Sequence, residues 1–361
     1  MSFKPSDTVI LIPSLEPDDR LPAYVEQLKA GGFEHVVVVD DGSSEKYQPV
    51  FGRIAAMPGC TVLHHDVNHG KGVALKTGYK WILENLPDCA GVITADADGQ
   101  HTVKDCVHLA EKVCEGERKL YLGARDFNLP NVPARSRNGN HITSAVFKVL
   151  YGQYLPDTQT GLRAFPASEL QFMIDVEGER YEYEMKVLIA CARAKIPMES
   201  ITIETIYENN NEGSHFHPLR DSWRIYKVIL GSFFMFMGAS FISWLIDYAL
   251  FNVLDYAVLR QMSLGDDASL IAAALARVVS ATFNFVLNRQ VVFKDDGGKR
   301  STFARYAILA VSVLITSAVG IRLLVAIHVP DWLAKIVCDV LLYFVNFNVQ
   351  SRWVFRSQER K

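Results

Sequence analysis

The first half of the chain alternates short apolar runs with polar-apolar patterns of helical period. The helical pattern is clearest over 21–30 and 72–86. Strands and helices that alternate at this spacing are typical of a largely parallel sheet with helices on both faces, so we expect an α/β fold. The apolar runs expected to form strands are Thr8–Ile12, His35–Val39, Gly91–Thr94 and Leu120–Leu122.

The second half consists mainly of long apolar segments, with most charges in the gaps between them. Each segment approaches or exceeds the roughly 20 residues that a helix needs to cross a bilayer. The sequence therefore predicts a soluble domain over 1–214 and an all-helical membrane domain over 228–361. The four predicted spans are about 228–254, 268–287, 303–327 and 332–349.

The segment between these domains, 215–227, mixes aromatic and basic residues. This composition favours a juxtamembrane amphipathic helix that lies at headgroup height and contacts membrane lipids. A plain polar linker is the alternative.

Lys and Arg side chains cluster before the first span, between the second and third, and after the fourth. The opposite loops carry only Arg260. By the positive-inside rule, both termini and the soluble domain are expected in the cytoplasm, with the protein integral to the plasma or inner membrane. The first residues lack the pattern of a signal peptide, and the six cysteines form no C-x-x-C pair, which fits a reducing compartment.

The membrane half also repeats itself at an offset of 62 residues, because FNFVLNRQVVF ending at Phe293 resembles VNFNVQSRWVF ending at Phe355. Under this offset Arg277 corresponds to Asp339, two opposite charges at matching depth. Charges within a bilayer are costly and are usually paired, so we expect an ion pair between these side chains. The alternative is that each side chain reaches water separately.

The overall composition agrees with these two domains and adds only an argument about partners. The chain has 361 residues, 49% of them hydrophobic, and a net charge of −3. A protein without a basic field is a poor candidate for binding nucleic acid, and no zinc-finger or basic-region pattern is present. Any anion site must therefore be local.

The pattern with the most specific chemistry is DADGQH, which follows a predicted buried strand. The carboxylates of Asp96 and Asp98, on the turn after that strand, can converge on one hard divalent cation, and the Gln100 amide oxygen can add a neutral ligand. Such a cation would neutralise a diphosphate leaving group. The alternative is an acidic turn that only caps a helix at Thr102.

Several motifs resemble, in order along the chain, those of the family-two glycosyltransferases with a GT-A fold. DTQTGLRAF resembles more narrowly the dolichyl-phosphate and polyprenyl-phosphate sugar transferases. The membrane half resembles the GtrA family through Asn288, Arg289, Val292 and Phe293. The motifs that carry the first resemblance are IPSLEP, VVVVDDGSS, NHGKG, DADGQH and the G-x-R of Gly123–Arg125.

This resemblance implies a donor site and a metal site. Asp40, after four valines, would recognise the base or ribose, although it could instead only form the turn. Lys71 would reach a phosphate or sugar, in a loop that is not a Walker motif. The residues implied to bind the nucleotide-sugar are Pro13, Ser14, Glu16, Asp40, Asp41, Lys71 and Asp96; those implied to hold Mg²⁺ or Mn²⁺ are Asp96, Asp98 and Gln100.

The acceptor phosphate would be a second anion beside the donor, and arginine suits its recognition through a planar bidentate fork. Arg125 matches the family's G-x-R position, whereas the spacing of Arg135 and Arg137 departs from the dolichyl enzymes. The residues expected to bind the acceptor phosphate are Arg125, Arg135, Arg137, Arg163, Ser214 and His215; those expected to act in catalysis are Asp98, Arg125 and Asp157.

The function expected from these observations is inverting transfer of a sugar from a UDP- or GDP-linked donor to a polyprenyl phosphate, with undecaprenyl slightly favoured over dolichyl phosphate. A phosphate monoester, with a second pKa near 6, is already ionised at neutral pH, so the nucleophile needs little help from a general base. Catalysis then depends mainly on positioning and electrostatics.

Two other functions fit parts of the sequence. A processive polysaccharide synthase would need a catalytic base, and its Q-x-x-R-W motif is absent. A transporter would use the repeated helices to flip a lipid-linked sugar, with the soluble domain as an accessory transferase. Assembly into a homo-oligomer through the membrane domain is left open.

Overall fold

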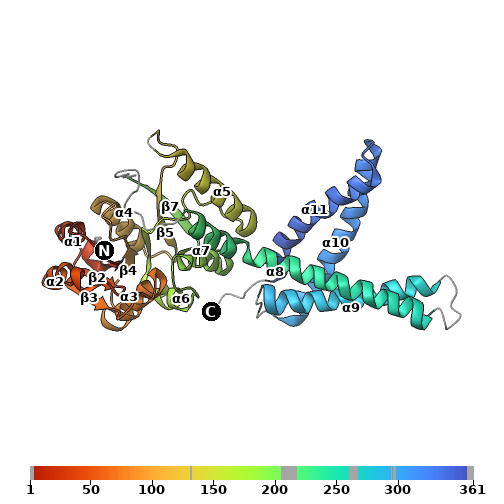
Figure 1. Cartoon of the computed structure of the whole chain (residues 1–361), viewed down its shortest axis with the longest axis horizontal. Coiled ribbons are helices and arrows are strands. Elements are labelled where there is room, and N and C mark those ends of the chain that lie inside the picture. The colour runs from red at the N-terminus through yellow and green to blue at the C-terminus, as the bar shows by residue number, and fades with distance from the viewer. Residues whose placement is uncertain are drawn as a thin grey trace. The chain divides into compact units, whose positions relative to one another are not determined.

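The computed structural model describes residues 4–130, 132–204, 218–259, 267–293, 295 and 298–355. The chain divides into two compact units, Met1–Ile229 and Leu230–Lys361 (Figure 1). The first unit holds the sheet, and the second holds long apolar helices. Each unit is described by itself below.

The first unit is built on one seven-stranded mixed sheet with the strand order β3-β2-β1-β4-β6-β5-β7. Strand β6 runs antiparallel to both of its neighbours, whereas the other paired strands are parallel. The expected largely parallel sheet is confirmed. The strands are β1 (Thr8–Ser14), β2 (His35–Asp40), β3 (Cys60–His64), β4 (Gly91–Thr94), β5 (Leu120–Arg125), β6 (Arg163–Pro166) and β7 (Met198–Ile203).

Three of these strands, β3, β6 and β7, carry no long apolar run and were not expected. Strand β3 lies at the edge of the sheet and is only half-buried, so it needs few apolar residues. Strand β6 has the sequence RAFP, in which a charged residue is buried. Its place in the sheet follows from hydrogen bonds with β4 and β5 rather than from its own pattern.

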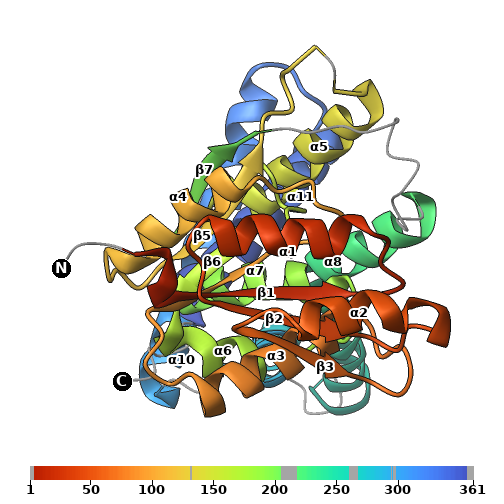
Figure 2. The ribbon, with the colours of Figure 1, turned by 90° about the vertical axis from the view of Figure 1, so that its left-hand side faces the viewer.

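Helices cover both faces of the sheet, as Figure 2 shows for α1 and α3 on opposite sides of the strands. One face packs against α1, α2 and α4 around a buried apolar cluster. The other face packs against α3, where a side chain on Gly78 would collide with Leu11. The helices are α1 (Arg20–Ala30), α2 (Gln48–Ala55), α3 (Lys71–Asn85), α4 (Val103–Cys114), α5 (Ala134–Tyr151), α6 (Leu170–Asp175) and α7 (Glu182–Ala194), with short 3₁₀ turns η1 (Pro5–Asp7), η2 (Glu45–Tyr47) and η3 (Ala167–Glu169).

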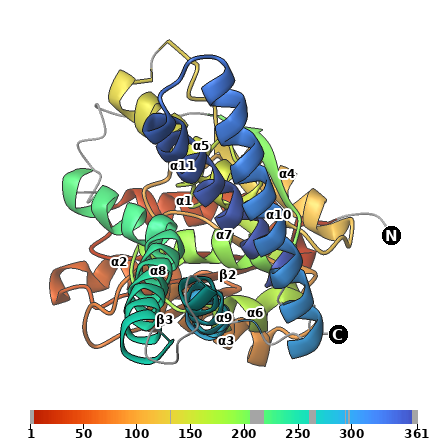
Figure 3. The same cartoon turned by 90° about the vertical axis from the view of Figure 1, so that its right-hand side faces the viewer.

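Among the described residues, the membrane unit has four helices that are long and apolar enough to cross a bilayer, and Figure 3 turns them toward the viewer. They correspond to the four predicted spans. Residues 218–227, expected as a separate juxtamembrane helix, are the continuous beginning of α8, and residues 215–217 lie outside the described residues. The elements are α8 (Pro218–Asn252), η5 (Val253–Leu259), α9 (Asp267–Leu287), η7 (Asn288–Val292), α10 (Lys299–Ala326), α11 (Asp331–Val349) and η8 (Gln350–Val354).

The predicted repeat appears in the backbone as two π-helical turns, η7 and η8, whose bounds differ by the offset of 62 residues. Each copy makes the same internal amide contact. Asn288 Nδ2 donates to Asn284 Oδ1 at 2.7 Å, and Gln350 Nε2 donates to Asn346 Oδ1 at 3.1 Å. The copies meet where Asn288 Nδ2 donates to Gln350 Oε1 at 3.3 Å.

The expected ion pair between Arg277 and Asp339 is wrong. Arg277 Nη2 lies 3.1 Å from Asp247 Oδ2 of α8. Asp339 instead accepts from Lys335, one turn earlier on its own helix, at 2.7 Å. The repeat predicts only that the two charges lie at the same depth. Each of them has a nearer partner of opposite charge.

Candidate active site

The candidate site lies where the carboxyl ends of β1, β2 and β4 meet, the edge at which ligands of such sheets bind. In the register of the sheet Ser14 is paired with Asp40, and Leu11 is paired with Thr94 at the end of β4. Asp96 and Asp98 follow directly on the turn after β4. The predicted donor and metal residues therefore come from adjacent strands.

Asp40 is buried at the end of β2, and its carboxylate is well supplied with hydrogen bonds. The Ser43 backbone N–H donates to Oδ1 at 2.8 Å, Gln48 Nε2 donates to Oδ2 at 3.0 Å, and His64 Nδ1 lies 3.0 Å from Oδ2. Burial by itself raises the pKa of Asp40, but these hydrogen bonds more than compensate and hold the pKa below its ordinary value. Asp40 thus stays an anion that orders the turn after β2.

Asp41 faces the N-H-G-K-G loop. Its Oδ1 accepts the backbone N–H of His69 at 3.0 Å, and its Oδ2 accepts that of Gly70 at 2.7 Å. His65 Nδ1 lies 2.8 Å from Oδ1. The geometry gives Asp41 a supporting role for this loop, and direct contact with the donor stays a prediction.

The two glycines of that loop let it approach the segment before α7. Gly70 has a φ of +105°, and a Cβ there would collide with the backbone of Glu179 and Arg180. A Cβ on Gly72 would come within 2.6 Å of Tyr183 Cβ. Only glycine fits at both positions, and the close approach brings Lys71, between them, to the beginning of α7.

Lys71 is the centre of a partly buried charge cluster. Its Nζ lies 2.7 Å from Asp96 Oδ1 and 3.1 Å from Glu184 Oε1, and His101 Nε2 lies 3.2 Å from Asp96 Oδ2. Burial lowers the pKa of Lys71, but the two carboxylates outweigh it and raise the pKa above its ordinary value. Burial likewise raises the pKa of Asp96, and Lys71 and His101 reverse the shift, so Asp96 is held as an anion.

Asp98 has a different environment. Within the described residues it forms no ion pair, and its Oδ1 accepts the backbone N–H of Gln100 at 3.0 Å. Burial and then the negative charge of Asp96 raise the pKa of Asp98 above its ordinary value. A cation beside these two carboxylates would relieve their repulsion, so the residues present fit a hard divalent metal ion.

The protein supplies only part of a coordination shell. In the part of the chain that the structure describes, no three His, Cys, Asp or Glu side chains are grouped to hold a metal ion. The expected ligands, Asp96, Asp98 and Gln100, would therefore need further oxygens from the diphosphate of a donor to complete a six-coordinate site.

Arg125, the last residue of β5, forms an ion pair with Asp157. Arg125 Nε donates to Asp157 Oδ2 at 2.7 Å, and its Nη2 donates to Oδ1 at 3.3 Å. Asp157 is completely buried, whereas the Arg125 side chain is partly exposed and its guanidinium lies over the Phe127 ring at 5.2 Å. Asp157 therefore orients Arg125, and the catalytic roles of both residues stay predictions.

A small cleft of about 40 Å³ joins these groups. It is lined by Asp96, Gln100, His101, Arg125 and Gln159 among others. Ser14 Oγ and His101 Nδ1 are among the buried polar atoms at this edge of the sheet that have no hydrogen-bond partner among the described residues. Buried polar atoms are rarely left unpaired in a complete site, so these two atoms suit contacts with a polar ligand.

The other predicted phosphate ligands differ in their surroundings. Arg137 donates to the carbonyls of Phe127 and Leu129 at 2.9 and 3.0 Å, and so holds its own loop. Arg163 is 5% exposed and donates to the carbonyls of Thr160 and Glu184, a burial that disfavours phosphate binding. The roles expected for three further residues stay predictions, because their side chains lie outside the described part of the structure. These residues are Arg135, Ser214 and His215.

The remaining predicted donor residues lie on the same edge. Pro13 is buried in β1 opposite Val39. Glu16 follows with a φ of +51°, and its backbone N–H donates to Ser43 Oγ at 2.8 Å. The turns after β1 and β2 are thus tied together beside the site.

Sequence reasoning gave no role to His101 and left that of Glu184 open. His101 was quoted only as part of DADGQH, and its contact with Asp96 could have been suspected from that motif. No pattern in the sequence joins Glu184 to Lys71. Gly161 was also missed. In the structure it lies against the Asp96 carboxylate, and a Cβ there would collide with it.

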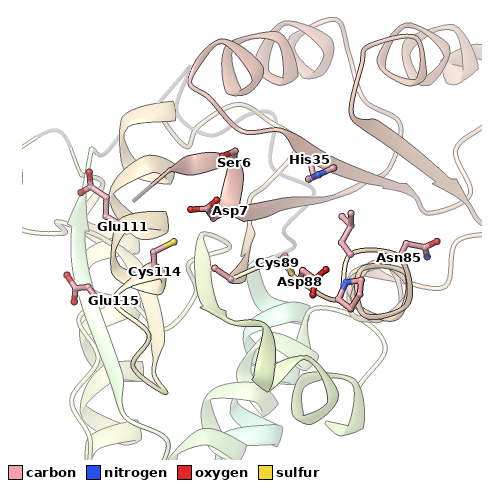
Figure 4. A pocket seen from close by; sticks show the side chains of 12 residues that line it. Ser6, Asp7, His35, Asn85, Asp88, Cys89, Glu111, Cys114 and Glu115 are labelled. Carbon is pink, nitrogen blue, oxygen red and sulfur yellow. The ribbon is translucent and has the colours of Figure 1, made fainter. Parts of the chain in front are cut away.

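A larger cavity of about 770 Å³ lies at the opposite edge of the sheet, among the amino ends of β1 and β2 (Figure 4). The described residues that line it include the carboxylates of Asp7, Asp88, Glu111 and Glu115 and no lysine or arginine. A diphosphate or a lipid phosphate would be repelled there. The smaller cleft beside Asp96 is therefore the better candidate for anionic substrates.

The chain matches two family models. The model of glycosyl transferase family 2 matches residues 9–171, and the model of the GtrA/DPMS transmembrane domain matches residues 225–355. The first match covers the strands and turns of the candidate site. The second covers the four long apolar helices.

Similar proteins are found in archaea and bacteria. An uncharacterised protein of Methanocaldococcus jannaschii is 30% identical over 229 residues, 62% of this chain and 92% of that protein. A UDP-N-acetylglucosamine--dolichyl-phosphate N-acetylglucosaminyltransferase of Methanococcus voltae is 27% identical over 55% of this chain and 85% of its own. An undecaprenyl-phosphate mannosyltransferase of Micrococcus luteus is 28% identical over 51% of this chain and 76% of its own.

Proposed function

Because the chain belongs to glycosyl transferase family 2 and carries a GtrA/DPMS transmembrane domain, we propose that it transfers a sugar from a nucleotide-sugar to a polyprenyl phosphate. The chain is a membrane protein with a GT-A-like domain, which suits an acceptor that lies in a membrane. Two relatives are named for acceptors of this class, dolichyl phosphate and undecaprenyl phosphate. The distribution of Lys and Arg supports a cytoplasmic catalytic domain.

The observation that carries the proposal is the pairing of an acidic turn with a cationic group in one cleft. Asp96, Gln100 and Arg125 all line this cleft. The reaction brings together a donor diphosphate and an acceptor phosphate, and it needs positive charge near both. A divalent cation, held by Asp96, Asp98 and Gln100, would offset the charge that develops on the departing diphosphate.

The chain's own side chains then have separate roles. Arg125, oriented by Asp157, would hold the acceptor phosphate through the part of its guanidinium that does not face Asp157. The phosphate is already ionised, so the site needs no strong base, and the attack proceeds in line on the anomeric carbon with inversion of configuration. Fixed charges and hydrogen-bond donors around the two neighbouring anions would then lower the barrier electrostatically.

The test is transfer of radiolabelled sugar from a panel of UDP- and GDP-sugars to undecaprenyl and dolichyl phosphate by the full-length protein, with Mn²⁺, Mg²⁺ or EDTA. A chloroform-extractable product that needs the cation is expected from one donor. Asp98→Ala should lower the rate about 100-fold or more, because it removes a group that acts directly on the transferred charge.

The matched control is Asp66→Asn, a change at an exposed carboxyl outside the cleft, which should transfer sugar at the wild-type rate. If folded protein makes no lipid-linked product from any donor, the proposal is wrong. Elongation of a sugar chain under the same conditions would instead support a polysaccharide synthase.

A further inference from the structure

Lys71 occupies the position beside Asp96 where a metal ion would be expected. Its Nζ lies 2.7 Å from Asp96 Oδ1 and 3.1 Å from Glu184 Oε1. The second oxygen of Asp96 faces His101 Nε2 at 3.2 Å. Both oxygens of this predicted metal ligand are therefore engaged by side chains of the protein itself.

The position of Lys71 is built by the fold. Asp41 accepts the two backbone N–H groups that precede Lys71, at 3.0 Å and 2.7 Å. After it, the Val73 N–H donates to the Glu179 carbonyl at 3.0 Å. The loop is thus fixed to the end of β2 on one side and to the segment before α7 on the other, so the ammonium group does not reach Asp96 by chance.

A cation that already neutralises Asp96 changes when a metal can bind. The electrostatic gain of placing Mn²⁺ or Mg²⁺ at Asp96 is reduced while Lys71 stays there, because the two cations repel each other. The described residues also offer few other ligands. A diphosphate would alter both conditions, since it supplies oxygen ligands for the metal and an anionic partner for Lys71.

We propose that Lys71 serves as a built-in counter-ion that keeps the divalent cation out of the nucleotide-free site, so that metal and donor diphosphate bind together. This inference rests on the proposed function for the identity of the donor. It assigns Lys71 a second role besides phosphate contact and sets the order of binding. By linkage, the nucleotide and the metal must strengthen each other's binding by the same factor.

The experiment measures Mn²⁺ binding to the full-length protein in detergent by the loss of the free Mn²⁺ electron paramagnetic resonance signal. Titrations are made with Mn²⁺ alone, with Mn²⁺ and UDP, and with Mn²⁺ and GDP. For the wild type, the matching nucleotide should tighten Mn²⁺ binding about tenfold or more, a normal size for coupled sites. Lys71→Gln should bind Mn²⁺ alone about tenfold more tightly than the wild type.

Two variants control for charge and folding. Lys80→Gln removes an exposed lysine from the same helix and should bind Mn²⁺ as the wild type does. Lys71→Arg keeps the positive charge and should still exclude Mn²⁺ when no nucleotide is present. A thermal melt of each variant checks that the protein is folded.

Tight Mn²⁺ binding by the wild type without nucleotide would overturn the proposal, and this comparison needs no variant. Unchanged Mn²⁺ affinity in folded Lys71→Gln would overturn it as well. Because sugar transfer is not measured, a failure of the proposed lipid acceptor leaves this result intact. Coupled binding without any lipid product would refute the proposed function alone.

Discussion

Within the D-x-D turn, the two carboxylates differ although the sequence presents them as equivalents. Asp96 is paired with Lys71 and faces His101, which keeps its pKa low. Asp98 lacks an ion pair within the described chain and has a raised pKa, owing to burial and to Asp96. Asp98 is therefore the carboxylate whose charge gains most from a bound cation.

The position of Asp96 also depends on a residue without a side chain. Gly161 packs against the Asp96 carboxylate, and its carbonyl accepts from Thr94 Oγ1 at 2.8 Å. Its φ is not in the left-handed region, so alanine is permitted by the backbone. The constraint at this position is space.

Gly161→Ala should displace the Asp96 carboxylate and lower sugar transfer about 100-fold, because a misplacement of about 1 Å is sufficient for such a loss. The melting temperature should change little, since the collision involves the end of one side chain. The measurements are the transfer rate and a thermal melt. Gly52→Ala, at an open position of α2, is the control; wild-type activity in Gly161→Ala would show that the contact has no catalytic importance.

At the scale of elements, the site is assembled from turns that follow β1, β2 and β4. The turn after β2 does two things with adjacent residues. Asp40 organises its own turn and the start of α2, whereas Asp41 holds the backbone of the N-H-G-K-G loop. The loop leads directly into α3, so its position is coupled to the packing of that helix on the sheet.

Asp41→Asn should weaken this loop, because an amide cannot accept at both of its terminal atoms and its NH₂ would face a backbone N–H. Leaving one buried donor unpaired costs about 1–3 kcal/mol of folding free energy. We therefore expect a lower melting temperature. We also expect about tenfold slower sugar transfer, because the Lys71 side chain would no longer be held in its position. Asp66→Asn changes an exposed carboxyl in the same loop and should have neither effect; equal behaviour of the two variants would contradict this role of Asp41.

At the scale of the whole molecule, the membrane unit is organised by its internal repeat. The π-helical turns η7 and η8 end α9 and α11, and equivalent amides meet between them. Such turns are uncommon and disrupt regular hydrogen bonding, so their presence in both copies indicates a shared packing requirement. Polar contacts between apolar helices define which helices pair.

The ion pair between Arg277 of α9 and Asp247 of α8 tests which helices of this unit are joined by polar contacts. Ser280 Oγ also donates to Asp247 Oδ1, at 2.8 Å. Arg277→Asp should destabilise the protein by about 1 kcal/mol, a usual size for polar contacts between membrane helices, which a thermal melt in detergent can detect. Adding Asp247→Arg to Arg277→Asp should restore the melting temperature, whereas adding Asp339→Arg should not. If only the double variant with Asp339→Arg regained the wild-type melting temperature, the pair inferred from the repeat would be favoured.

Much of the fold could be predicted because its elements are encoded locally. The valine and isoleucine runs of β1 and β2 have a length and composition typical of buried parallel strands. The four apolar segments are long enough to span a bilayer whatever their neighbours are. The D-x-D turn was expected directly after a buried strand, and the structure confirms that it follows β4.

By itself, then, the sequence determined the two kinds of domain, most buried strands, the spans, the repeat and the acidic turn, because each depends on residues that are close together in the chain. Only the tertiary structure decided that β6 runs antiparallel, that Lys71 lies between Asp96 and Glu184, and that Arg277 pairs with Asp247. These contacts join distant segments, and their partners are selected by packing geometry, for which local pattern carries no information.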